Sequence, residues 1–122
     1  MSETYSDHNH NFEFVKFDGV LVYDELMRRF DPKLVKMQFQ VAVISLGFKA
    51  EDFLTKYPGR FVSLHLADYS TADKKMVPVG QGVVDWKKVF AAAKKGGVKN
   101  FFVEMNMEAL KPSCDYLRGL KV

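Results

Sequence analysis

Polar side chains that can bind a metal ion stand at the ends of four apolar segments of the sequence. His8 and His10 close the first segment, Gln40 lies late in the second, His65 closes the third, and Glu104 closes the fourth. In α/β barrels the reactive groups project from the carboxyl ends of the strands. Imidazoles and a carboxylate from separate strands can then converge on one divalent cation.

Each of these residues also has a plain structural interpretation. A single histidine such as His65 is more often a hydrogen-bonded core residue than a ligand, and Glu104 can simply pair with a lysine. Alternation in His8-Asn9-His10 puts both imidazoles on one face, but a position near the chain start favours a loose, exposed segment. The repetition of polar residues at four segment ends favours the functional interpretation.

Several other residues are interpreted as structural. Glu13 and Asp18 are predicted to be solvated loop charges. Gly80-Gln81-Gly82 could approach a phosphate through backbone N–H groups, but a plain turn is the better interpretation of so short a pattern. Cys114 is the only cysteine, which excludes an intramolecular disulfide and a cysteine metal cluster.

The segments that carry the polar residues alternate between strand and helix patterns. Met37 and Phe39 face one way while Gln38 and Gln40 face the other, which is the period-2 pattern of a strand. Asp85 is a good N-cap for the clearest helix, which Gly96-Gly97 ends. Strands are predicted at Tyr5–His10, Val35–Ile44, Phe61–Leu66 and Phe101–Glu104, with a long loop at Ala67–Val84, and helices at about Tyr23–Phe30, Glu51–Tyr57, Trp86–Lys95 and Pro112–Leu120.

Strands that alternate with helices favour parallel pairing through right-handed crossovers. A barrel of eight such units needs roughly 250 residues, and the chain has 122. The sequence therefore predicts an α/β fold in one domain over residues 1–122, with four strands and four helices forming about half of a TIM barrel. Such a sheet leaves one face and both edges uncovered. Self-association, or a missing N-terminal half-barrel, is expected to cover them.

Composition limits the possible partners. The formal charge is +3, and the lysines occur in pairs rather than in one basic stripe, so no nucleic-acid partner is expected. The start of the chain has no apolar signal region, and no apolar run approaches the roughly 18 residues of a membrane span. We therefore predict a soluble, cytoplasmic protein without a membrane partner.

The motifs as a set resemble the sugar phosphate isomerase/epimerase family, which belongs to the xylose isomerase-like TIM barrels. The similarity runs over nearly the whole chain, in the order found in the second half of those proteins. It is carried by His8-Asn9-His10-Asn11-Phe12-Glu13-Phe14, Lys56-Tyr57-Pro58-Gly59-Arg60-Phe61, Ser63-Leu64-His65-Leu66-Ala67-Asp68, Pro78-Val79-Gly80-Gln81-Gly82-Val83-Val84-Asp85-Trp86 and Phe102-Val103-Glu104.

This resemblance implies a divalent metal (manganese, magnesium or zinc) that polarises the oxygens of a bound sugar or sugar phosphate, while carboxylates move a proton. It places metal ligands at His8, His65 and Glu104, and Gln40 stands where an aspartate ligand is expected. His65 and Glu104 are also the implied catalytic residues. The implied substrate contacts are His10 and Asp68.

The sequence departs from the family pattern at three of these points. Gln40 is neutral and a poor ligand, Ala67 stands where the motif commonly carries lysine, and His8 replaces a glutamate. Two functions are therefore expected: a metal-assisted isomerase or epimerase of carbohydrate metabolism, or a non-catalytic sugar-binding or assembly module. An endonuclease on the same barrel fits less well, because it would need more ligands and a basic groove.

Overall fold

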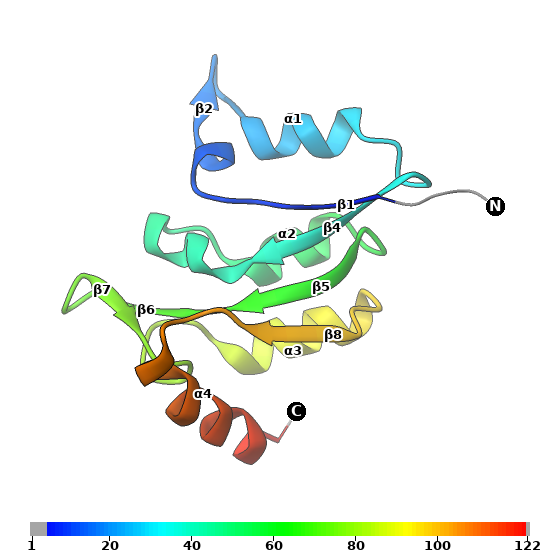
Figure 1. Cartoon of the computed structure of the whole chain (residues 1–122). Coiled ribbons are helices and arrows are strands. Elements are labelled where there is room, and N and C mark those ends of the chain that lie inside the picture. Colours follow the sequence, from blue (N-terminus) through cyan, green and yellow to red (C-terminus); the bar gives the residue numbers. More distant parts are fainter. Residues whose placement is uncertain (1–4, 122) are drawn as a thin grey trace.

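The computed structural model describes residues 5–121 and has a four-stranded parallel sheet at its centre (Figure 1). The sheet order is β1-β4-β5-β8, and a helix follows each of these strands along the chain. The predicted α/β half-barrel with four parallel strands and four helices is confirmed. The strands are β1 (Tyr5–His8), β4 (Val35–Gln40), β5 (Phe61–Leu66) and β8 (Asn100–Val103), and the helices are α1 (Val22–Arg29), α2 (Ala50–Lys56), α3 (Trp86–Lys95) and α4 (Met107–Gly119).

The strand register gives the sheet one apolar face and one polar face. The apolar face carries Met37, Phe39 and Leu64, which are fully buried under the helices. The register between β4 and β5 shifts after Met37, which is paired with Phe61, so that the next pair is Gln38 with Ser63. This irregularity keeps Phe61 in the core while the polar side chains that follow on β5 lie on the other, inner face.

Aromatic side chains form the centre of the core beneath α1 and α2. The ring centroids of Phe14, Tyr23, Phe39 and Phe53 lie 4.8 to 6.0 Å from one another. These rings join an apolar strip on α3, where Trp86, Val89 and Ala93 are buried and Phe90 is partly buried. A core packed in this way holds the strands, and with them the inner face, in a fixed position.

The predicted strand at Val35–Ile44 is too long. Strand β4 ends at Gln40, and the chain continues as the 3-10 helix η2 (Val41–Leu46). The Gln40 side-chain oxygen accepts a hydrogen bond from the Ala42 backbone N–H at 3.2 Å, which caps this helix. Gly47 ends it at a φ of 89°, a conformation that glycine adopts without steric cost.

The predicted start of the last helix at Pro112 is wrong by five residues. Helix α4 begins at Met107, because the Asn106 side chain accepts a hydrogen bond from the Ala109 N–H at 3.0 Å and so acts as the N-cap. Pro112 therefore lies inside the helix rather than in its first turn.

Several short elements lie in segments that were predicted as loops. A hairpin of β2 (Lys16–Phe17) and β3 (Val20–Leu21) turns at Asp18-Gly19, where both residues have positive φ. A second hairpin, β6 (Asp68–Ser70) with β7 (Lys75–Val77), stands in the predicted loop Ala67–Val84, and the 3-10 helix η1 covers Phe12–Phe14. No helix within residues 5–121 is long and apolar enough to cross a membrane.

Candidate functional site

Four inner-face side chains form one hydrogen-bonded cluster at the carboxyl ends of β4, β5 and β8. Glu104 directly follows β8, and its Oε2 accepts a hydrogen bond from the Gln40 Nε2 at 2.9 Å. The same oxygen is hydrogen-bonded to Nδ1 of His65. The Oε1 of Gln38 accepts from the Nε2 of His65 at 2.9 Å. We call these four residues, Gln38, Gln40, His65 and Glu104, the polar cluster.

The first strand adds a row of imidazoles to the polar cluster. The His8 ring stacks on the His65 ring with 5.1 Å between centroids. His10 lies 4.4 Å from His8, and Phe12 lies 5.4 Å beyond His10. The structure thus brings His8, Gln40, His65 and Glu104 together, while His10 lies at the exposed end of the row, with 57% of its side chain exposed.

Two buried residues that the sequence did not single out for the site hold this arrangement. Asn9 is fully buried, and its Oδ1 accepts from the Gln40 backbone N–H at 2.9 Å. Its position between two outward imidazoles was the available signal, because strand alternation turns that side chain to the opposite face. Glu13 is 6% exposed and accepts from the His10 backbone N–H at 2.7 Å. The prediction of a solvated loop charge at Glu13 is therefore wrong.

The neighbours of His65 determine where its protons lie. The Gln38 Nε2 donates to Ser6 Oγ at 3.0 Å, which turns the amide oxygen of Gln38 toward His65. His65 Nε2 therefore carries a proton. Nδ1 faces the Glu104 carboxylate and is hydrogen-bonded to it. Glu104 remains half exposed, with 53% of its side chain accessible, so one member of the pair faces solvent.

Asp68 lies apart from the polar cluster and has a structural role. Its carboxylate is 0% exposed and accepts from the Trp86 Nε1 at 2.8 Å. It also accepts from three backbone N–H groups, those of Tyr69, Gly80 and Val84, at 2.8 to 3.1 Å. Because four internal donors occupy the buried carboxylate, Asp68 cannot contact a substrate in this arrangement. The prediction of a substrate contact at Asp68 is therefore wrong.

The polar cluster does not fit a divalent cation in this arrangement. Within residues 5–121, no three His, Cys, Asp or Glu side chains are placed to hold a metal ion. The Gln40 oxygen is held by the Ala42 N–H, so its amide NH₂ points at Glu104. A cation there would meet an NH₂ donor instead of an oxygen ligand, and His65 has both ring nitrogens engaged within the cluster.

Comparison with known proteins gives the identity of the fold. No protein-family model matches the sequence, and no curated protein matches it. Two crystal structures of sugar phosphate isomerase/epimerases from Parabacteroides distasonis are similar, each with a TM-score of 0.81, at 23% and 21% sequence identity. The chain has the fold of part of a sugar phosphate isomerase/epimerase. The similarity covers 98% and 94% of this chain but only 46% and 44% of those two chains, so this chain spans less than half of their length.

The superposition confirms the resemblance that the motifs predicted, at the level of the fold. In barrels of this kind, function resides at the carboxyl ends of the strands. Of the positions that the resemblance singles out, His8, Gln40, His65 and Glu104 meet at that rim of the half-barrel.

Proposed function

We propose that this half-barrel belongs to a sugar or sugar phosphate isomerase/epimerase, and that the polar cluster binds the sugar through hydrogen bonds. The observation that carries the proposal is the imidazole–carboxylate pair of His65 and Glu104 at the carboxyl rim of adjacent parallel strands. The fold likeness to sugar phosphate isomerase/epimerases supports it. Amide, imidazole and carboxylate groups are the side chains that recognise sugar hydroxyls, since each can donate or accept a hydrogen bond.

The His65–Glu104 pair can perform the proton transfer that such a reaction needs. The half-exposed Glu104 carboxylate would accept the proton from the carbon next to a sugar carbonyl. The hydrogen bond from His65 Nδ1 would orient that carboxylate. Delivery of a proton to the former carbonyl carbon, together with transfer of the hydroxyl proton between the two oxygens, gives the isomer. The proton held on the half-exposed Glu104 can exchange with water before it is delivered. Epimerisation would need in addition a second acid on the opposite face of the carbon.

The divalent metal that the resemblance implies has no part in this scheme, because the polar cluster presents an amide NH₂ at position 40. Whether Mn²⁺, Mg²⁺ or Zn²⁺ binds stays a prediction, which calorimetric titration of the chain with each ion would test. The same NH₂ group favours a second function, a sugar-binding module without catalysis. Gln40 can donate to a sugar oxygen but cannot take a proton from carbon.

Proton exchange separates the two functions. The chain is incubated in D₂O with a panel of ketoses and ketose phosphates, and NMR follows both sugar binding and deuterium incorporation next to the carbonyl. The enzyme function predicts exchange that Glu104→Gln abolishes, while Glu108→Gln, at an exposed glutamate on α4, leaves it unchanged. Binding without exchange supports the binding module. If no sugar binds at millimolar concentration, both assignments fail.

A further inference from the structure

We propose that two copies of this chain close one eight-stranded barrel, in which β8 of each copy pairs with β1 of the other. This inference goes beyond the proposed function and does not depend on sugar binding. A second copy of the same chain then covers the inner face and both edges of the sheet.

The first observation is that the sheet is open at both ends. β1 and β8 are its two edge strands, and all four strands run parallel. Parallel sheets are normally covered on both faces, and open strand edges recruit further strands. The inner face also holds Ser63, whose hydroxyl is buried and has no hydrogen-bond partner among the described residues. Phe102 stands on the same face of β8, with 56% of its surface exposed.

A hollow along the β8 edge has room for an additional strand. Its volume is about 600 Å³, and it lies between the outer face of β8 and the apolar side of α4. Figure 1 shows α4 beyond the last strand of the sheet, with no further strand beneath it. In a barrel, the helix that follows a strand also covers the next strand. The hollow is lined by Phe101, Val103, Leu110, Cys114 and Leu117.

The opposite edge has side chains that suit this hollow. Tyr5 and Asp7 pair with Val35 and Met37 on β4, and Met37 is in the core, so both β1 side chains turn toward the helix layer. The Tyr5 side chain is 62% exposed and can pack against apolar groups beneath α4 of a second copy. Arg118 lines the hollow and gives the carboxylate of Asp7 a partner of opposite charge.

Strand number and symmetry favour a second copy as the occupant. Two copies provide eight strands, the number at which side chains fill the interior of a barrel. A twofold axis makes the β8–β1 contact twice and leaves no edge open, which ends assembly at a dimer. Both polar clusters then lie at the same rim.

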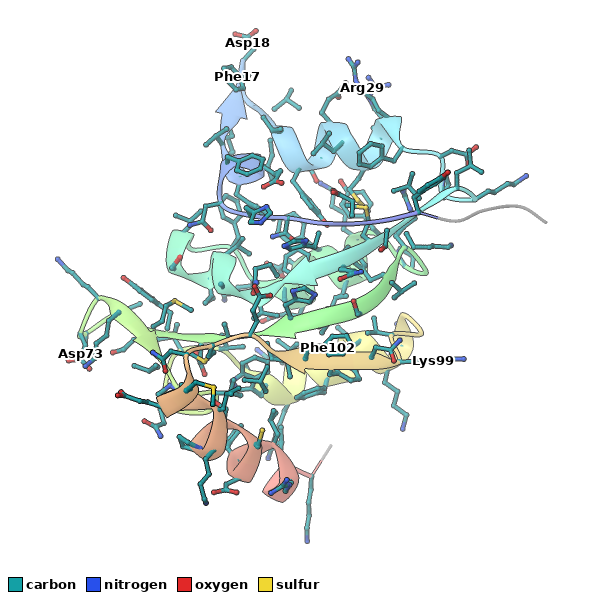
Figure 2. The ribbon with its side chains drawn as sticks, in the orientation of Figure 1. Phe17, Asp18, Arg29, Asp73, Lys99 and Phe102 are labelled. Carbon is teal, nitrogen blue, oxygen red and sulfur yellow. The ribbon has the colours of Figure 1, made fainter. Side chains whose placement is uncertain are left out.

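Sedimentation equilibrium at micromolar concentrations tests the stoichiometry. The expected species has twice the mass of the chain. Phe102→Asp places a charge at the β8 contact and should raise the dimer dissociation constant by at least about tenfold. Phe17→Asp is the matched control, because Phe17 is 71% exposed on the distant β2–β3 hairpin (Figure 2). A monomer throughout this range, growth beyond two copies, or equal effects of the two variants would overturn the proposal.

Hydrogen exchange on the unmodified chain tests the edges and needs no variant. The amides of Tyr5–His8 and Asn100–Val103 should exchange more slowly as concentration rises, while those of the β6–β7 hairpin keep their rates. A dimer whose β1 and β8 amides show no added protection would refute the strand pairing even if the mass doubles. A stable monomer would overturn the dimer and would indicate that a different polypeptide pairs with these edges.

Discussion

Replacing Asp68 by asparagine is predicted to destabilise the fold strongly, because the carboxylate is a fully buried acceptor for four hydrogen bonds. Asparagine has nearly the same shape, so the substitution changes hydrogen bonding and charge with little change in packing. One carboxylate oxygen accepts from the Gly80 N–H and the Trp86 Nε1–H, and the other from the Tyr69 and Val84 N–H groups. An amide can satisfy only one of these two pairs of donors.

The size of the effect follows from the two hydrogen bonds that must be lost. A hydrogen bond to a charged group contributes about 1.5–3 kcal/mol to the free energy of unfolding, so the loss is about 3–6 kcal/mol. The total free energy of unfolding of a domain of this size is about 5–15 kcal/mol. If the free energy of unfolding falls by about 1.5 kcal/mol per M of urea, Asp68→Asn should lower the urea midpoint by about 2–4 M or unfold the chain altogether.

Urea unfolding followed by circular dichroism and tryptophan fluorescence measures this effect. Trp86 is the only tryptophan, so the emission reports directly on the indole that donates to Asp68. Asp52→Asn serves as the control, since Asp52 is exposed on α2 and should change the free energy of unfolding by less than about 1 kcal/mol. If Asp68→Asn matched that control and left the emission unchanged, the structural role of the buried carboxylate would be refuted.

Three further predictions test other parts of the structure. Gly82→Ala should lower the free energy of unfolding by several kcal/mol in urea titrations, because the added Cβ would collide with the Asp68 carboxylate. At Gly119, a Cβ meets nothing within 4 Å, so Gly119→Ala should raise the free energy of unfolding by up to about 1 kcal/mol. Hydrogen bonds from the two arginines that follow on α1 lower the pKa of Glu25 from 4.5 to about 2, so its stabilising contribution is complete above pH 4.5 and is lost as the pH falls toward 2. The difference in Tm between the parent chain and Glu25→Gln should therefore shrink over that interval, and a constant difference would contradict this assignment. Gln40→Asp should raise the affinity for Mn²⁺ in calorimetric titrations, and a control at exposed Gln81→Asp should not; equal heats for the two variants would mean that the rim side chains do not converge on an ion.

Patterns that depend on neighbouring residues allowed much of the fold to be predicted. Strand β5 has the predicted bounds, and helix α3 starts after the Asp85 cap and ends before Gly96-Gly97, as predicted. The last helix was misplaced because Pro112 suggested a start, while the actual cap at Asn106 is a single residue in an ambiguous segment. The 3-10 helix after Gln40 was missed because its apolar residues also suit a strand.

Features that depend on contacts distant in sequence could not be predicted in this way. The donors to Asp68 come from Gly80, Val84 and Trp86, and only the path of the β6–β7 hairpin brings them to one carboxylate. The positions of the strand ends did allow the residues at the rim to be predicted, because parallel strands place their carboxyl ends at one edge of the sheet. The same argument could not predict which side chains are hydrogen-bonded to each other. The bond between Gln38 and His65, for example, depends on the register shift between β4 and β5.

The amide at position 40 satisfies hydrogen-bonding groups on both sides of the polar cluster. An aspartate there would place a second carboxylate beside Glu104, and two like charges at that distance repel unless a positive ion lies between them. Gln40 instead donates an N–H to Glu104 and uses its oxygen to cap the helix after β4, so both ends of the amide are satisfied. His65 supplies the remaining hydrogen bond to the same carboxylate oxygen. A neutral amide at position 40 therefore suits a hydrogen-bonded arrangement at this rim better than the coordination of a cation.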